Sequence, residues 1–84
     1  MDEAELLHTL SAIVAEACGH DRLTLTRAST AAEVKGWDSL RMVMIIVAVE
    51  ERFGIKMRTR EIDRLKSVGD FVDLIRGRMA AAKG

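Results

Sequence analysis

The sequence predicts an all-α protein, a single domain of residues 1–84 that forms a four-helix bundle with a long first loop and a short third helix. A chain of 84 residues has room for only one hydrophobic core. Proline and tyrosine are absent, and aromatic residues make up 4% of the chain. Ala, Leu, Met, Glu and Arg, which favour helices, are frequent. Apolar residues recur at spacings of three and four, the period of a helix rather than of a strand.

The first helix is expected over residues 1–18 and is followed by a loop over residues 19–38. Acidic residues at the start suit the positive end of the helix dipole, and Gly19 provides a C-terminal stop. Residues 19–37 have no sustained periodicity and contain several Ser and Thr. A loop of this length in a small domain tends to be functional. The apolar positions of the helix are Leu6, Leu10, Ile13, Val14 and Ala17.

The second helix is expected over residues 39–53. Asp38 can cap its N-terminus, and Gly54 can end it in a left-handed conformation. The helix is apolar nearly all round, which predicts a central position in the bundle. The stripe that faces the core is expected to contain Met42, Ile45, Ile46, Val49 and Phe53.

A short third helix is expected over residues 59–65. Thr59 is its expected N-cap, and only Ile62 and Leu65 are available as apolar anchors. So few anchors predict one or two turns at most.

The last helix is expected over residues 67–80. Ser67 and Asp70 have the S-x-x-D spacing of a capping box. Residues 81–84 are expected to fray as a chain terminus.

Composition excludes several classes of protein. One cysteine excludes an internal disulfide framework and a multi-Cys metal site. The longest apolar run, Met42 to Val49, has eight residues, whereas a membrane span needs about 20. The N-terminus is acidic, where a signal peptide would be basic. These features predict a cytoplasmic protein without a transmembrane helix.

Charge is unevenly distributed along the chain. Residues 1–21 carry five acids and no Lys or Arg, whereas residues 52–84 carry nine bases and four acids. Such asymmetry is compatible with a small helical domain that binds nucleic acid or a protein through the basic segment 56–66. It is equally compatible with a dipolar surface whose halves attract each other. A formal net charge of zero argues against general affinity for a phosphate backbone.

The chemistry-bearing motif lies where the long loop meets the second helix. Residues 36–40 read Gly-Trp-Asp-Ser-Leu. A helix N-terminus favours a phosphate because its backbone N–H groups are unpaired and the helix dipole is positive there. Ser39, directly after a capping Asp38, would present its hydroxyl on rigid backbone. Such a serine is a suitable acceptor for a phosphate-linked group.

Two other roles for Ser39 are open from the residues alone. It could be an ordinary residue of the first helical turn, the commoner role for a lone serine. It could also be a catalytic nucleophile, but neither His8 nor His20 falls in a recognisable triad pattern, and residues 36–40 do not form a G-x-S-x-G elbow.

With this motif the sequence resembles the acyl carrier protein family, which includes peptidyl and aminoacyl carrier domains of about this size. The family attaches 4′-phosphopantetheine through a phosphodiester to the Ser of an Asp-Ser-Leu motif, which matches Asp38, Ser39 and Leu40. The resemblance covers nearly the whole chain. It continues through the Glu-Glu-x-Phe-Gly ending at residues 50–54 and a Ser-Val-Gly-Asp start to the last helix.

The resemblance implies a freestanding carrier that is not an enzyme. A phosphopantetheinyl transferase would add the arm from coenzyme A to Ser39, and the arm would hold an acyl or aminoacyl group as a thioester. The other partners would be enzymes that load this cargo and transfer it, in fatty acid, lipid or polyketide biosynthesis. A monomer without nucleic-acid, metal or membrane partners is expected. A long acyl chain would lie in a cleft lined by Val43, Ile46, Ile62 and Leu65.

The outer stripe of the second helix is expected to bind partners. It contains Arg41, Met44, Ala48 and Glu51 at helical spacing. In the resembled family this stripe is typically acidic and docks on basic patches of partner enzymes. Arg41 and Met44 stand where the first two acids would be, which implies a specialised carrier with dedicated enzymes. The alternative is that the basic residues of this region are merely solvated.

Overall fold

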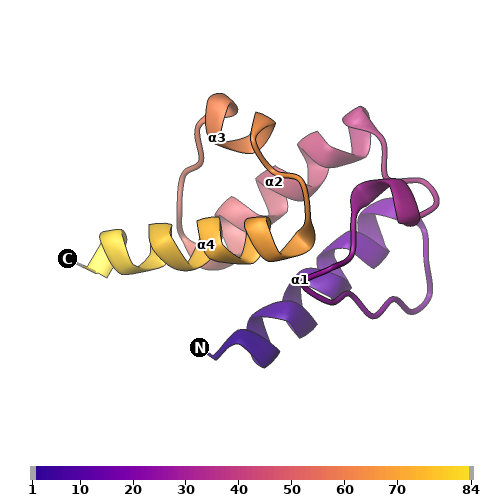
Figure 1. Cartoon of the computed structure of the whole chain (residues 1–84), viewed down its shortest axis with the longest axis horizontal. Coiled ribbons are helices and arrows are strands. Elements are labelled where there is room, and N and C mark those ends of the chain that lie inside the picture. Colours follow the sequence, from indigo (N-terminus) through magenta and orange to yellow (C-terminus); the bar gives the residue numbers. More distant parts are fainter. Residues whose placement is uncertain (1, 84) are drawn as a thin grey trace.

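The computed structural model, which describes residues 2–83, confirms the all-α, four-helix prediction. Within these residues no strand occurs, and a short 3-10 helix, η1, interrupts the long loop. In Figure 1, α4 crosses the view between α1 below and α3 above, and both termini lie in the left half of the view. None of the described helices is long and apolar enough to cross a membrane. The bounds are α1 Glu3–Cys18, η1 Ala31–Glu33, α2 Ser39–Phe53, α3 Thr59–Asp63 and α4 Val68–Lys83.

The first helix has the ends that its sequence signals predict. The side chain of Asp2 accepts a hydrogen bond from the backbone N–H of Glu5 at 2.8 Å, so Asp2 is the N-cap and the helix begins at Glu3, not at residue 1. Met1 lies outside the described residues. Gly19 ends the helix with φ +77°, a left-handed conformation that favours glycine.

The core lies between α1, α2 and α4, and α1 packs against both of the others. The expected stripe of α2 is confirmed at its centre, since Ile45, Ile46 and Val49 are buried. Met42 and Phe53, at the two ends of this stripe, are only partly buried and pack against the edge of the core. The other helices contribute mainly Leu6, Leu10, Val14, Val68, Phe71, Val72 and Ile75.

The long loop is fixed to the helices by backbone hydrogen bonds. The N–H groups of Val68 and Gly69, at the start of α4, donate to the carbonyls of Ser29 and Arg27 at 2.8 and 2.9 Å. A helix N-terminus has N–H groups without helical partners, and here the loop supplies two acceptors. A Cβ at Gly69 would lie 3.0 Å from the Arg27 carbonyl oxygen, so this close approach favours glycine.

A buried serine fixes the same loop to α1. The Ser11 hydroxyl donates to the Leu7 carbonyl at 2.7 Å and accepts the N–H of Leu25 at 3.1 Å. Both Ser11 and Leu25 are buried.

Replacing Ser11 with alanine should lower the free energy of unfolding by about 1–3 kcal/mol, because the buried N–H of Leu25 would lose its acceptor. Urea denaturation followed by circular dichroism measures this loss. A loss under about 0.5 kcal/mol would mean that the loop finds another acceptor and does not depend on Ser11.

Two expectations for the third helix are wrong. Thr59 is the first residue of α3 rather than its N-cap, and Arg58 takes the N-cap position, where its N–H donates to the Glu61 carboxylate at 3.0 Å. The helix was expected to reach residue 65 but ends at Asp63. Beyond that residue the Leu65 N–H bonds to the Ile62 carbonyl, three residues back, so the chain tightens into a turn and leaves the α-helix.

The last helix starts and ends later than expected. It begins at Val68, because Ser67 lies outside it as a cap: the Ser67 hydroxyl accepts from the Asp70 N–H, and the Asp70 carboxylate accepts from the Ser67 N–H. The predicted capping box is thus confirmed. The expectation that residues 81–84 fray is wrong up to Lys83, since alanines continue the helix at no propensity cost. Gly84 lies outside the described residues.

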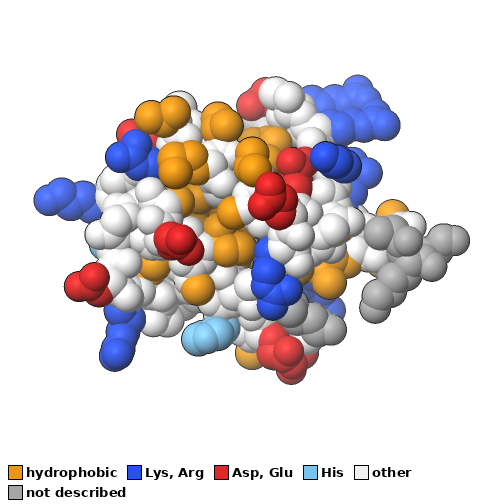
Figure 2. Space-filling model, turned by 180° about the vertical axis from the view of Figure 1, so that it is seen from behind, with side chains coloured by type: hydrophobic (Ala, Val, Ile, Leu, Met, Phe, Trp, Pro, Cys, Tyr) orange, Lys and Arg blue, Asp and Glu red, His pale blue; other side chains and the backbone are white. Residues whose placement is uncertain are grey.

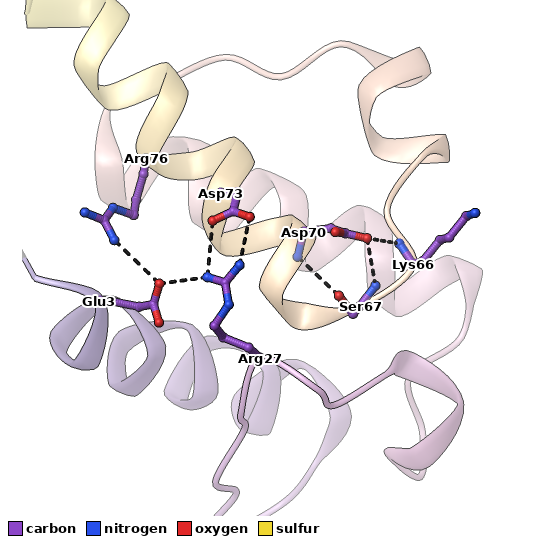
Figure 3. Close-up of polar contacts among 7 residues, drawn as sticks. All are labelled: Glu3, Arg27, Lys66, Ser67, Asp70, Asp73 and Arg76. Carbon is purple, nitrogen blue, oxygen red and sulfur yellow. Dashed lines mark hydrogen bonds and ion pairs between the residues drawn. The ribbon is translucent and has the colours of Figure 1, made fainter.

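The charge asymmetry is partly accounted for by attraction between the two ends of the chain. Figure 3 shows the Arg27 guanidinium between Glu3 of α1 and Asp73 of α4, with nitrogen–oxygen distances of 2.7 and 2.8 Å. Arg76 lies 3.5 Å from the same Glu3 carboxylate. The hydrogen bond from Arg27 lowers the pKa of Asp73. These groups are largely solvated, so the cluster orients the loop rather than providing much stability.

Candidate functional site

The site is built around the N-terminus of α2. Asp38 is confirmed as the N-cap, with its carboxylate accepting the Arg41 N–H at 2.8 Å. Gly36 makes the preceding turn with φ +91°, and a Cβ there would lie 3.0 Å from the Cys18 carbonyl oxygen. The turn therefore brings the loop against the end of α1, and glycine allows both the conformation and the approach.

Trp37 closes the turn onto the first turn of the helix. Its indole N–H donates to the sulfur of Met42 at 3.2 Å, and the side chain is half-buried. Together with the Asp38 cap, this contact holds the backbone around Ser39 in one conformation.

Ser39 is the first residue of α2 and is exposed. Within residues 2–83 its hydroxyl has no hydrogen-bond partner, so the oxygen is free to react. The neighbouring N–H groups at the helix start and the positive end of the helix dipole favour a phosphate on this oxygen. The exposed hydroxyl, the rigid cap and the helix terminus thus fit a phosphodiester-linked group.

A groove opens beside Ser39, between α2 and the segment that carries α3. Its volume is about 740 Å³, which lies within the usual range for small-molecule sites. The residues expected to line an acyl cleft, Val43, Ile46, Ile62 and Leu65, all lie on its wall. Ser39 and Asp38 stand at the rim. The wall is mostly apolar, so the groove can shelter an apolar chain that starts at Ser39.

Several groove residues were not expected from the sequence. Trp37, Met42 and Val47 line it, together with Met57. Val47 lies one turn beyond Val43 on the same side of α2, so helical spacing could have identified it. Met57 lies in a coil without periodicity, where its position depends on the Glu50 carboxylate, which accepts the Met57 N–H at 2.9 Å.

The expected partner-binding stripe is only partly exposed. Met44 and Glu51 are exposed, but Arg41 and Ala48 are half-buried. The exposed large apolar side chains of α2 lie on a stripe rotated slightly from the expected one and contain Leu40, Val43, Met44 and Val47. Because the helix is apolar nearly all round, its sequence alone does not determine which stripe faces out.

Cys18 is not activated as a thiolate nucleophile. Burial raises the pKa of its thiol, although the nearby Arg41 acts in the opposite direction. A thiol with a raised pKa is mostly protonated at neutral pH, and the protonated form is not the nucleophile. In the part of the chain that the structure describes, no group of His, Cys, Asp and Glu side chains could hold a metal ion.

Comparison with known proteins identifies the class of protein that has this fold and site. Residues 8–75 match the family described as phosphopantetheine attachment site. The acyl carrier protein of Thermosynechococcus vestitus is 36% identical over 81 residues, covering 96% of this chain and all of that protein. The acyl carrier protein of Acidothermus cellulolyticus is 35% identical over 89% of both chains.

A solved structure has the same fold. It is the solution NMR structure of a holo acyl carrier protein from Geobacter metallireducens, with a TM-score of 0.82 and 34% identity, covering 90% of this chain and 87% of that one. This chain belongs to the acyl carrier protein family, and its cofactor is covalently attached 4′-phosphopantetheine. Members of the family interact with phosphopantetheinyl transferases and with acyl-handling enzymes.

Proposed function

We propose that this acyl carrier protein holds its 4′-phosphopantetheine arm on the Ser39 oxygen. The observation that carries the proposal is the exposed Ser39 hydroxyl on the first residue of α2, fixed between the Asp38 cap and the rest of the helix. It stands beside a mostly apolar groove of about 740 Å³. Other serines lack this combination: Ser11 is buried and its hydroxyl is bonded twice, and Ser67 caps α4.

The chain's own residues contribute positioning to the attachment reaction. The Ser39 oxygen loses its proton and bonds to a phosphorus of coenzyme A, while the phosphoanhydride bond to the adenosine bisphosphate part breaks. Asp38 and the α2 backbone hold the oxygen at the helix terminus, whose dipole favours the phosphodiester charge. The terminal thiol of the bound arm carries the cargo as a thioester. The protein itself carries out no catalysis, and the transferase provides the acid and base groups.

The groove beside Ser39 is proposed as the shelter for an acyl chain. Each apolar Å² removed from water there contributes about 25 cal/mol. Three carboxylates, Asp38, Glu50 and Asp63, also line it, and they confine apolar cargo to the part between Val43 and Leu65.

Loading the arm with an octanoyl group should raise the thermal midpoint of unfolding above that of the unloaded holo protein, because the chain binds the folded groove only. Ile62→Asn should reduce this increase, since Ile62 is in the groove wall. Differential scanning calorimetry of the unloaded and the octanoyl-loaded protein measures this increase in the thermal midpoint. Leu7→Asn, a partly buried residue of α1 outside the groove, should leave the increase unchanged. An equal increase in the two variants would contradict this role of the groove.

The proposed partners are a phosphopantetheinyl transferase and the enzymes that load and transfer the cargo. These approach over the exposed side of α2, where Met44 and Glu51 are exposed and Arg41 and Ala48 are half-buried. The protein acts as a cytoplasmic monomer in this scheme.

Incubation with coenzyme A and a broad-range phosphopantetheinyl transferase tests the proposed function. Intact-mass spectrometry should show the addition of one phosphopantetheine per chain. An unchanged mass under conditions that modify another acyl carrier protein completely would contradict it.

A further inference from the structure

The surface around Ser39 has an apolar centre. Leu40, Val43, Met44 and Val47 follow one another at helical spacing on α2 and are 64%, 62%, 50% and 48% exposed. Figure 2 shows hydrophobic side chains gathered over this side of the molecule, with Lys and Arg side chains beside them over α3. We call these four residues the apolar strip. A contiguous exposed strip of this kind marks a surface that another molecule covers.

The strip and α3 border the same groove. Val43 and Val47 of the strip line one wall, and Thr59, Ile62 and Asp63 of α3 line the other. Any protein that reaches an arm on Ser39 across the strip therefore also meets α3 and its flanking residues.

The α3 region is basic, and its cations are unpaired. Residues 56–66 contain five Lys and Arg against Glu61 and Asp63. Within residues 2–83, none of these five cations forms an ion pair, whereas Arg27, Arg76 and Arg78 each do. We call the five cations the basic segment: Lys56, Arg58, Arg60, Arg64 and Lys66.

Most of the nearby carboxylates are already engaged. Glu61 is ion-paired with Arg78, whose hydrogen bond lowers the pKa of Glu61. Glu50 accepts the Met57 N–H, and Asp38 caps α2. Residues 38–66 in total carry seven Lys and Arg against five Asp and Glu. This segment therefore has a local excess of two cations, and all five cations of the basic segment are exposed.

We infer that the apolar strip and the basic segment together bind a partner enzyme whose docking face has an apolar centre flanked by carboxylates. Such a face would cover the strip and neutralise the exposed cations of the basic segment. A basic docking face would meet like charges there, which slows association and penalises the complex. The inference rests on the proposed function, because it assumes that partners approach Ser39.

The test measures binding to one probe enzyme in two forms. The probe is a ketoacyl synthase of fatty acid synthesis with a basic carrier-docking face, and its second form has those Lys and Arg changed to Glu. Surface plasmon resonance gives association rates and Kd values at low and high salt for the unmodified chain, so no arm is needed. We expect the acidic form to associate at least about tenfold faster than the basic form at low salt, with the difference fading at high salt.

Matched charge changes assign the effect to α3. Arg60→Glu should speed association with the basic form about fivefold at low salt. Arg22→Glu changes another exposed cation, which borders a different hollow beside α1, and it should change the rate less than about twofold. Met44→Ser should weaken binding to the acidic form about tenfold at either salt concentration, since it removes apolar contact. Circular dichroism should show unchanged helix content in all three variants.

Equal binding of the two probe forms, or equal effects of Arg60→Glu and Arg22→Glu, would overturn the inference. Binding of a duplex DNA oligonucleotide as tight as that of the acidic probe would also overturn it, because the basic segment would then recognise polyanions in general. The mass test with coenzyme A distinguishes a failure of this inference from a failure of the proposed function. Normal modification with no charge preference contradicts only this inference, whereas absent modification contradicts the proposed function.

Discussion

Replacing Ser39 with alanine should abolish attachment of 4′-phosphopantetheine while leaving the fold intact. The hydroxyl oxygen is the proposed attachment atom, so its removal should lower the modified fraction from complete to none. Alanine is a good residue for the first turn of a helix, and the Asp38 cap on the Arg41 N–H remains. Intact-mass spectrometry after incubation with coenzyme A and the transferase measures the modified fraction, and circular dichroism measures the helix content.

Ser67→Ala is the matched control, because Ser67 also stands at a helix N-terminus. The Ser67→Ala variant should be modified completely. Its free energy of unfolding should fall only by the small contribution of the bond between the Ser67 hydroxyl and the Asp70 N–H. Modification of Ser39→Ala would show that another side chain accepts the arm. Loss of modification in Ser67→Ala but not in Ser39→Ala would move the site to α4.

Replacing Phe71 with alanine should have the largest effect on stability. Its side chain is 2% exposed and is among the largest in the core. Removing a fully buried phenyl group costs about 3–5 kcal/mol, through lost burial and the cavity left behind. Small domains have total stabilities of about 5–15 kcal/mol, so the variant should be close to unfolding.

The other phenylalanine provides the comparison. Phe53 ends α2 and is only partly buried, so Phe53→Ala should cost clearly less than Phe71→Ala. Urea denaturation of both variants gives the two free energies of unfolding. Equal losses, or a larger loss for Phe53→Ala, would mean that the core is centred nearer the end of α2 than the structure places it.

Helix ends that depend on local chemistry could be predicted from the sequence. The caps at Asp38 and Gly54, and the reciprocal bonds of Ser67 with Asp70, use groups within five residues of one another. The start and end of α3 could not be predicted in this way. The backbone N–H of Arg58 bonds to Glu61, although arginine has no special preference for an N-cap.

Contacts between residues far apart in the chain could not be predicted from the sequence. The bond from the Leu25 N–H to Ser11 and the ion pair of Arg27 with Asp73 join residues 14 and 46 positions apart. Nothing local in the loop indicates which distant side chain will be its partner. These contacts hold the loop that leads to Ser39.

The position of the candidate site could be predicted more fully than its surface. The motif at residues 36–40 identified the loop-to-helix boundary, and the four residues expected in a cleft do line a groove. Which stripe of α2 faces outward could not be determined, because apolar residues occupy nearly all of its circumference. The packing of α2 against α1 in the folded protein determines this, and it leaves Leu40 and Val47 exposed.

Fragment mass spectrometry of the modified protein tests the central claim most directly. The chain is incubated with coenzyme A and the transferase, digested, and the peptides that contain each serine are fragmented. The structure predicts that phosphopantetheine is found on Ser39 and on no other residue. Phosphopantetheine on Ser11, Ser29 or Ser67, or an unmodified peptide around Ser39 from a protein whose intact mass has increased, would contradict the account.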